Sequence, residues 1–315
     1  MEERKKILVV FEADGAHRTA LEKCAPEADF FYEKEPDAGL IGEADAVLGN
    51  LPPERLAEAR SLKWLQLCSA GANGYAEAMP SGAALTNASG AYGPSISEYM
   101  ICAVMNLFLK FPQYRDNQRA RVWRDEGAPK FIEGSTALVV GLGNIGGEFA
   151  KRYRALGGRV IGVKRTPAPK PDYLDGLYTM EGLDGLLPEA DVVALSLPGT
   201  PETKGLFGAE RLARMKEGAV LVNVGRGTAV DTDALAAALA SGHLFGAALD
   251  VTDPEPLPES HPLWGIPSAL ITPHISGRWY VAENFERIFT ICTENLVRFS
   301  KGRPLLHRVD LKLGY

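Results

Sequence analysis

A short apolar run that ends in three closely spaced glycines is the feature that most constrains the fold. Residues 136–140 are rich in β-branched side chains, and three glycines precede a helix-like segment at 147–156. The first glycine permits a tight exit from a strand, the second lets a ligand approach the backbone, and the third lets the helix pack closely. The helix N-terminus then faces phosphate groups. The pattern therefore predicts a dinucleotide-binding turn, although such a motif alone is a weak signal. Its predicted cofactor-binding residues are Gly141, Gly143, Asn144, Ile145 and Gly146.

The segments after this turn alternate between apolar runs and connectors. Apolar runs recur at residues 159–163, 191–196, 219–223, 246–250 and 269–272. Between them, residues 231–242 begin with the N-cap residue Asp231 and end at Gly242, which predicts a crossover helix. Short buried strands alternating with helices indicate a parallel, doubly wound sheet. We therefore expect a Rossmann-type domain.

The first hundred residues show a similar rhythm and predict a second parallel sheet. Their apolar runs are residues 6–11, 28–32, 46–49, 62–68 and 84–87. A long helix is expected from 95 to about 122, with Pro112 marking a kink or break. Another is expected from 283 to 298, where an apolar face could return the chain to the first domain. The expected fold class is α/β, with a Rossmann-type domain (residues 98–282) inserted into a flavodoxin-like substrate domain (residues 1–97, completed by 283–315).

Composition bounds the class of protein. The chain has 315 residues, 46% hydrophobic and 23% charged, which is enough for two cores, and its net charge of -6 argues against nucleic-acid binding. The charged segment 2–6 leads only into the short apolar run 7–11, too short for a signal peptide, and no later segment approaches a membrane span. A cytoplasmic protein without a membrane partner is expected. Four scattered cysteines without metal-ligand or CxxC spacing predict reduced, mostly buried thiols and no metal site.

Three ionisable residues each follow a predicted strand. Arg226 follows the run at 219–223, while Glu255 and His274 follow the next two runs. Ligands of open α/β sheets bind outside the carboxyl ends of the strands, so these side chains are expected to converge there. An arginine can grip a carboxylate, a histidine can exchange a proton near neutral pH, and a glutamate can orient that histidine. The three residues are the candidate catalytic group.

The order of these motifs resembles the D-isomer-specific 2-hydroxyacid dehydrogenase family. The resemblance rests on Val-Asn-Val-Gly-Arg-Gly at 222–227, Ala-Leu-Asp-Val at 248–251 with Glu-Pro-Leu at 255–257, and Thr-Pro-His at 272–274, all after the glycine turn. It extends to residues 65–71 and 197–203, and so covers nearly the whole chain. Four ordered motifs are far more specific than one glycine turn.

The resemblance implies a role for each matching residue. Arg226 would anchor the substrate carboxylate and carbonyl, Glu255 would partner the histidine, and His274 would be the acid/base. Asp250 would contact the nicotinamide end. The resemblance places further cofactor contacts at Leu197, Pro198, Thr203, Val224 and Gly277. Substrate-binding residues would be Arg226, His274 and the backbone N–H groups around Ala70, Gly71 and Ala72.

The predicted cofactor preference rests on a departure from the family pattern. NAD-specific members usually carry an acidic residue after the second strand, whereas here residues 159–163 are followed by Lys164, Arg165 and Thr166. Two cations and a hydroxyl suit a 2′-phosphate, so NADP(H) is the preferred cofactor and NAD the alternative. The opposing interpretation is a basic strand end that faces only solvent.

A second departure follows the histidine, where many family members have small residues. Here Trp279 and Tyr280 bring bulky groups, and they either shape the substrate pocket, together with Leu51 and Tyr75, or pack at the hinge.

The expected function is reduction of a small 2-oxo acid, such as glyoxylate, hydroxypyruvate or a branched-chain analogue, to the D-2-hydroxy acid. A nucleotide-sensing interaction protein on the same fold is the alternative. A homodimer is also expected, because the segment 95–122 has more apolar surface than one helix normally buries, and the resemblance places it and the following arm at a two-fold interface.

Overall fold

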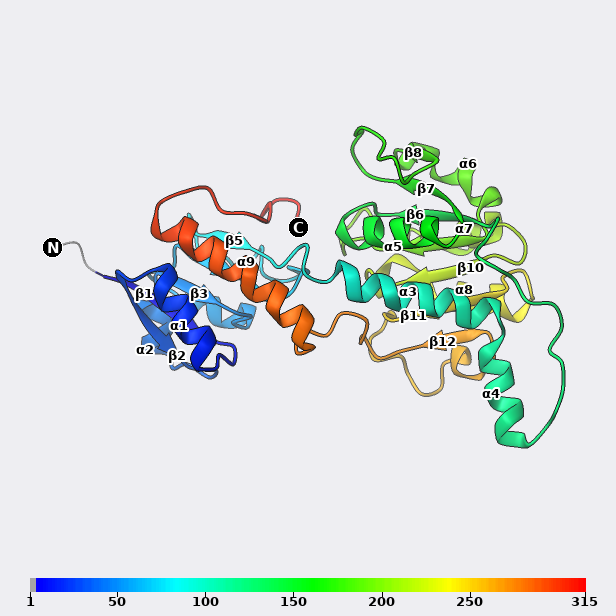
Figure 1. Ribbon diagram of the computed structural model, residues 1–315, viewed down its shortest axis with the longest axis horizontal. Helices are drawn as coiled ribbons and strands as arrows, with labels where there is room; N and C mark the ends of the chain where they lie inside the picture. The colour runs from blue at the N-terminus through cyan, green and yellow to red at the C-terminus, as the bar shows by residue number, and fades with distance from the viewer. Residues whose placement is uncertain (1–3) are drawn as a thin grey trace. The chain divides into compact units, whose positions relative to one another are not determined.

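The computed structural model describes residues 4–315, so part of the charged segment at 2–6 lies outside the described residues. The chain divides into two compact units (Figure 1), here called unit 1 (Met1–Tyr92 with Arg278–Tyr315) and unit 2 (Gly93–Gly277). The predicted boundaries, at 97 and 282, lie five residues beyond 92 and 277.

Unit 1 is built on a five-stranded parallel sheet. Its strands are β1 (Lys5–Val9), β2 (Ala28–Tyr32), β3 (Ala46–Leu48), β4 (Trp64–Gln66) and β5 (Ala84–Thr86). Their order, β2-β1-β3-β4-β5, is the flavodoxin-like doubly wound order. The helices are α1 (Gly15–Cys24), α2 (Ala38–Glu43) and α9 (Ala282–Ser300), of which α9 packs against α1. The helix expected at 283–298 is therefore confirmed, and it completes this unit.

Unit 2 is built on a seven-stranded parallel sheet. Its strands are β6 (Thr136–Val140), β7 (Arg159–Val163), β8 (Gly176–Tyr178), β9 (Val192–Leu195), β10 (Val220–Asn223), β11 (Gly246–Leu249) and β12 (Ala269–Ile271). The order β12-β11-β10-β9-β6-β7-β8 reverses direction between β6 and β9, the Rossmann switch point. The expected insertion of a Rossmann-type unit into a flavodoxin-like unit is confirmed.

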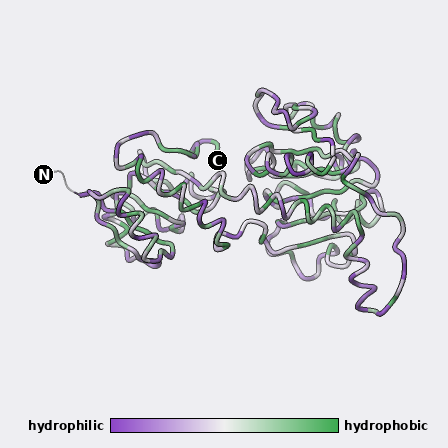
Figure 2. Tube along the Cα trace, viewed as in Figure 1, coloured by the Kyte–Doolittle hydropathy of each residue, from purple (hydrophilic) through white to green (hydrophobic). Residues whose placement is uncertain are grey.

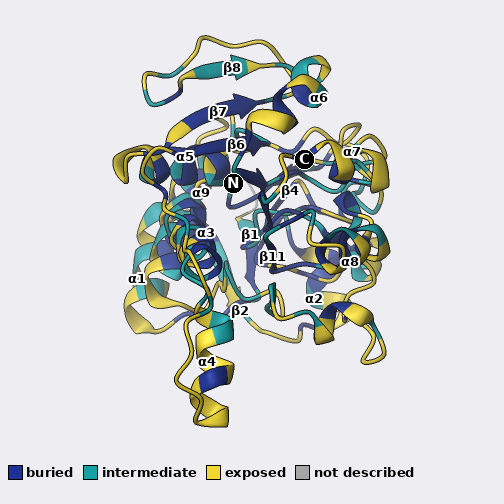
Figure 3. Cartoon of the chain, turned by 90° about the vertical axis from the view of Figure 1, so that its right-hand side faces the viewer, coloured by how far each residue is buried: buried dark blue, intermediate teal, exposed yellow. Residues whose placement is uncertain are grey.

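The helices of unit 2 accompany a sheet whose central strands are buried on both faces. They are α3 (Gly93–Phe108), α4 (Phe111–Ala120), α5 (Asn144–Ala155), α6 (Leu183–Leu186), α7 (Ala209–Arg214) and α8 (Thr232–Ala240). Every residue of β6, β9, β10 and β11 is buried, which explains their continuous apolar sequences. Figure 3 shows β6 and β11 in the colour of buried residues. Helix α8 begins as predicted, because the Asp231 side chain accepts a hydrogen bond from the Ala234 N–H.

The helical segment expected at 95–122, with a kink or break at Pro112, forms two helices, so the break near this proline is confirmed and a single kinked helix is not found. Lys110 adopts the left-handed conformation (φ 56°) between α3 and α4. Pro112 lies in the first turn of α4, where its missing N–H costs no helical hydrogen bond. The proline thus starts the second helix instead of kinking one long helix. Figure 2 shows α4 and the chain after it as mostly hydrophilic.

All four cysteines are free thiols, as the sequence predicts, but only Cys68 and Cys292 are buried. No helix within residues 4–315 has the length and apolarity needed to cross a membrane.

Candidate active site

The glycine turn of unit 2 leaves no room for side chains at its first and third glycines. Gly141 has φ +96°, and a Cβ there would lie 2.8 Å from the Ser196 carbonyl oxygen. A Cβ on Gly146 would lie 2.4 Å from the Gly141 carbonyl oxygen. The second glycine, Gly143, has no atom within 4 Å of its ideal Cβ position and faces open space. The turn is therefore tight where the strand and helix meet and open where a pyrophosphate would approach.

The first turn of α5 fits an anion. Gly143 is its N-cap residue and supplies no side chain that could accept hydrogen bonds from the first N–H groups. Asn144 and Ile145 follow as the first two helical residues. These N–H groups and the helix dipole favour a phosphate here. The residues present thus fit the dinucleotide that the glycine pattern predicts.

The end of β7 carries the two cations that bear on cofactor choice. Lys164 is half-buried, whereas Arg165 and Thr166 are exposed. The pKa of the Glu202 carboxyl lies below its ordinary value, first because of a hydrogen bond from Thr200 and in smaller part because of the positive charge of Arg165. Arg165 therefore lies near the loop that follows β9, on the carboxyl side of the switch point.

The loop after β9 contains three of the expected cofactor contacts. Leu197 is buried and Pro198 is half-buried. The hydroxyl of Thr203 donates to the Pro198 carbonyl oxygen at 2.7 Å and accepts from the Thr200 N–H at 3.0 Å. Thr203 thus fixes the shape of this turn.

Arg226 lies in the loop after β10. The glycines on either side of it pack closely against neighbouring backbone, which fixes the position of Arg226. A Cβ on Gly227 would lie 1.8 Å from the Thr252 carbonyl oxygen, and one on Gly225 would lie 2.6 Å from the Leu197 carbonyl oxygen. Both flanking positions therefore require glycine. Burial lowers the pKa of Arg226 below its ordinary value, and the negative charge of Glu255 opposes this shift. A partly desolvated guanidinium is well suited to grip a carboxylate.

His274 and Glu255 form a hydrogen-bonded pair. The His274 Nδ1 and Glu255 Oε1 atoms are 2.8 Å apart, and the two side chains are 53% and 44% exposed. A carboxylate at Nδ1 fixes the ring orientation and leaves Nε2 for a reacting group. Because Glu255 also acts electrostatically on Arg226, the structure brings together the three residues that the sequence singled out.

Asp250 organises the loop that carries the histidine. Its side chain is 1% exposed, and its carboxylate accepts hydrogen bonds from the Thr272 hydroxyl (2.6 Å) and the N–H groups of Ile275 (2.8 Å) and Ser276 (2.9 Å). The expected contact of Asp250 with the nicotinamide end stays a prediction. No role for Thr272 follows from the sequence.

The two remaining expected cofactor contacts are Val224 and Gly277. Val224 directly follows β10 and is buried, and its N–H donates to the Leu195 carbonyl oxygen at 3.1 Å. Gly277 is the last residue of unit 2 and is half-buried.

The expected substrate loop belongs to unit 1, after β4. Among residues 4–315, the N–H groups of Ala70, Gly71 and Ala72 donate to no protein acceptor. Two of the loop's carbonyl oxygens are held within unit 1, because Asn87 Nδ2 donates to Ala70 O and Ser69 Oγ donates to Gly71 O, at 2.8 and 2.7 Å. The loop thus offers consecutive donors that suit a carboxylate.

Side chains that sequence reasoning missed fix the start of this loop. Asn50 Oδ1 accepts from the Cys68 N–H at 2.8 Å and from the Ser69 N–H at 3.4 Å. The Tyr92 hydroxyl donates to the Cys68 carbonyl oxygen at 2.5 Å. No local pattern marks these residues, because their partners are backbone atoms about twenty residues away.

The bulky residues that follow the histidine are exposed. Trp279 is 46% and Tyr280 56% exposed, and their rings meet edge to face. Leu51 and Tyr75, in contrast, are buried in the hydrophobic core of unit 1. The core position of Leu51, 1% exposed, shows that it packs inside this unit.

Comparisons with known proteins agree with this geometry. Residues 101–276 match the family described as D-isomer specific 2-hydroxyacid dehydrogenase, NAD binding domain. The chain is 32% identical to a glyoxylate reductase of Thermofilum pendens, over 72% of this chain and 68% of that protein. It is 34% identical to a D-3-phosphoglycerate dehydrogenase of Mycobacterium leprae over 90% of this chain, but the match spans only 51% of that longer protein.

A solved structure resembles the whole chain. The D-isomer specific 2-hydroxyacid dehydrogenase of Xanthobacter autotrophicus Py2, in complex with NADPH and MES, is 30% identical, with a TM-score of 0.84 and coverage of 99% of this chain and 100% of that one. Motifs, fold and relatives agree, and the chain belongs to the D-isomer specific 2-hydroxyacid dehydrogenase family.

Proposed function

We propose that this enzyme reduces a small 2-oxo acid to the D-2-hydroxy acid with NADPH. The observation that carries the proposal is the hydrogen bond of 2.8 Å between His274 and Glu255, with Arg226 within electrostatic reach, at one edge of a dinucleotide-binding sheet. The complete group favours turnover over a nucleotide-sensing role, which needs no acid/base residue.

His274 and Arg226 have separate tasks in this reaction. The nicotinamide, when bound, supplies the hydride. His274, held through Nδ1 by Glu255, donates a proton from Nε2 to the developing alkoxide oxygen, so negative charge does not accumulate there. Arg226 pairs with the substrate carboxylate and polarises the carbonyl, which fixes the orientation of the substrate. In the oxidative direction His274 accepts the same proton.

The preference for NADPH rests on Lys164, Arg165 and Thr166. No carboxylate follows β7, where NAD-specific relatives present one to the ribose hydroxyls. The similar enzyme of Xanthobacter autotrophicus was solved with NADPH, which supports this assignment.

The proposed substrates are glyoxylate, hydroxypyruvate or a branched-chain analogue. The N–H groups of Ala70, Gly71 and Ala72 would bind the carboxylate that all of these share. Similarity to the glyoxylate reductase of Thermofilum pendens supports a short substrate.

Cofactor oxidation with a panel of 2-oxo acids tests the proposal. We expect NADPH oxidation with at least one of the three substrates, and little in His274→Ala despite retained NADPH affinity. Tight NADPH binding without turnover of any 2-oxo acid would instead favour the nucleotide-sensing protein.

We further propose a homodimer formed through unit 2. Helices α3 and α5 border an apolar groove of about 530 Å³, which Ile101, Met105, Leu109, Phe111 and Leu156 line. The arm after α4 adds Trp123, which is fully exposed, and Phe131, 64% exposed. Large apolar surfaces of this kind are typical of subunit interfaces.

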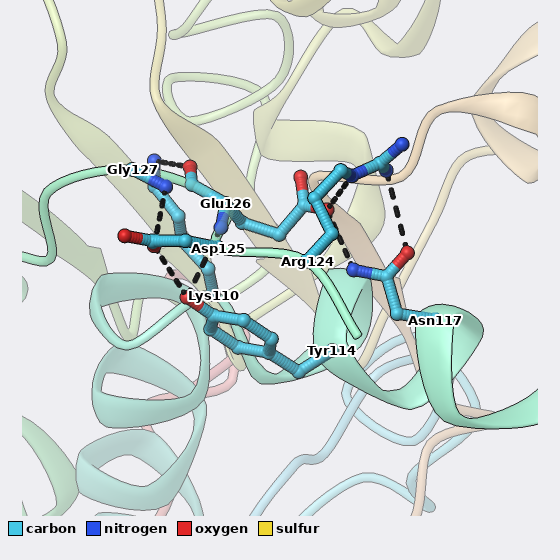
Figure 4. Close-up of polar contacts among 7 residues, drawn as sticks. All are labelled: Lys110, Tyr114, Asn117, Arg124, Asp125, Glu126 and Gly127. Carbon is cyan, nitrogen blue, oxygen red and sulfur yellow. Dashed lines mark hydrogen bonds and ion pairs between the residues drawn. The ribbon is translucent and has the colours of Figure 1, made fainter. Parts of the chain in front are cut away.

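Polar contacts hold the arm against α4 (Figure 4). Asn117 Nδ2 and Arg124 Nε donate to Glu126 Oε1, at 2.6 and 2.8 Å. The Tyr114 hydroxyl donates to Asp125 Oδ1 at 3.1 Å. A preordered arm loses little entropy on association, which favours binding of a second copy.

Sedimentation equilibrium measures the subunit number directly. For the wild type we expect about twice the chain mass of 34.0 kDa. In Trp123→Ala we expect the measured mass to fall toward that of one chain. A wild-type monomer at micromolar concentration would contradict the dimer.

A further inference from the structure

A chain of hydroxyl groups connects helix α3 to the loop that carries His274. The Tyr99 hydroxyl lies 2.7 Å from Thr272 Oγ1, which lies 2.6 Å from Asp250 Oδ1. All three residues belong to unit 2.

The direction of these hydrogen bonds follows from the groups involved. The Asp250 carboxylate can only accept, so the single hydroxyl proton of Thr272 points to it. Thr272 Oγ1 then has only lone pairs for Tyr99, which must be the donor. Burial raises the pKa of Tyr99 to about 12, so the phenol keeps its proton at neutral pH.

Asp250, the last residue in this series of hydrogen bonds, shapes the backbone at His274. His274 has φ +51°, in the left-handed region that residues other than glycine rarely adopt. Its N–H donates to the Asp250 carbonyl oxygen at 2.9 Å, and the next two N–H groups donate to the Asp250 carboxylate. Asp250 therefore holds the unusual conformation that directs His274 toward Glu255.

We propose that Tyr99 is a positioning residue for His274, acting through Thr272 and Asp250. Tyr99 lies on α3, which packs against α5 and against strand β11, and so anchors the loop to the framework of unit 2. Without its hydrogen bond, Thr272 and the Asp250 carboxylate gain freedom, and the imidazole spends less time in the productive orientation. The inference rests on the proposed role of His274 as the acid/base.

The test compares kcat and KM, with glyoxylate and hydroxypyruvate, among Tyr99→Phe, Thr272→Val, Thr272→Ser and the double variant Tyr99→Phe/Thr272→Val. We expect kcat to fall about fivefold in Tyr99→Phe and more than about tenfold in Thr272→Val, with KM for NADPH within about twofold of wild type. Thr272→Ser keeps the hydroxyl and should retain activity. The double variant should match Thr272→Val, because Tyr99 acts only through Thr272.

Tyr153→Phe is the matched control. Tyr153 is a buried tyrosine of the same unit, and its hydroxyl lies 2.5 Å from Ser135 Oγ, away from the catalytic group. We expect its thermal unfolding midpoint to fall as in Tyr99→Phe while kcat stays unchanged.

Unchanged kcat in Tyr99→Phe, an equal loss of kcat in Tyr153→Phe, or additive losses in the double variant would overturn the inference. If Thr272→Val does not fold, Tyr99→Phe and Thr272→Ser still decide it. Substantial turnover by His274→Ala would contradict the proposed function itself, which separates the two failures.

Discussion

Unit 2 and unit 1 present their candidate site residues in different ways. In unit 2, Arg226 and His274 follow directly from strands, and glycine packing or backbone hydrogen bonds fix their loops. In unit 1, the loop at 69–72 is shaped by the side chains of Asn50, Asn87 and Tyr92, which reach its start from other segments. The loops themselves leave motifs in the sequence, at 222–227, 272–274 and 65–71, whereas the distant side chains that shape the unit 1 loop leave none.

The two designs should also respond differently to substitution. In unit 2 the charged group itself carries the chemistry, so its loss should affect kcat. In unit 1 the side chains support backbone donors, so their loss should affect substrate KM.

Of the substitutions that test this comparison, Arg226→Lys should lower kcat/KM the most. It keeps the charge but loses the planar fork that binds a carboxylate, so we expect kcat/KM to fall about 10²- to 10³-fold with NADPH affinity unchanged. Arg214→Lys is the control, because Arg214 is an exposed arginine of the same unit that pairs with Glu210 at 2.9 Å. Activity near wild type in Arg226→Lys would remove Arg226 from the site.

Lys164→Asp should change cofactor choice by a smaller factor. Loss of a charged hydrogen bond to a 2′-phosphate costs about 1.5–3 kcal/mol, so the ratio of kcat/KM for NADPH to that for NADH should fall about 10- to 100-fold. Lys312→Asp makes the same change of charge in unit 1 and should leave the ratio unaltered. A wild-type enzyme that uses NADH as efficiently as NADPH would refute this interpretation of the strand end.

Asn50→Ala should have the smallest effect on kcat/KM. It tests whether the unit 1 loop affects KM more than kcat. The N–H groups of Cys68 and Ser69, which donate hydrogen bonds to Asn50 Oδ1, would lose their acceptor. We therefore expect KM for the 2-oxo acid to rise about fivefold, with kcat less affected. Asn50→Asp keeps an acceptor oxygen, but its negative charge opposes the substrate carboxylate, so KM should recover only in part. If kcat falls more than KM rises, the loop is not a binding element of the kind described.

The same distinction explains how much of the fold could be predicted. Strand β7 lies where the sequence places it, because a buried strand in a parallel sheet requires a continuous apolar run. Strand β8 was missed, because its three residues, Gly176–Tyr178, carry no such run and are held by pairing with β7. The break between α3 and α4 lies at Lys110, two residues before the expected position at Pro112, because a left-handed lysine has no sequence signal comparable to glycine.

The candidate site shows the same limit. Arg226, Glu255 and His274 could be predicted, because each lies in the loop that follows a strand at one sheet edge, and their residue types suggest a common chemistry. Tyr99 and Thr272 could not, because their importance depends on a hydrogen bond between residues 173 positions apart in the chain.

The pH dependence of kcat/KM in both reaction directions tests the central claim most directly. His274 must carry a proton to assist reduction and must lack one to assist oxidation. We therefore expect reduction with NADPH to weaken toward alkaline pH, oxidation of the D-2-hydroxy acid to strengthen over the same range, and Glu255→Gln to move both profiles together. Parallel pH profiles in the two directions, or profiles that Glu255→Gln leaves unchanged, would contradict an acid/base role for the His274 and Glu255 pair.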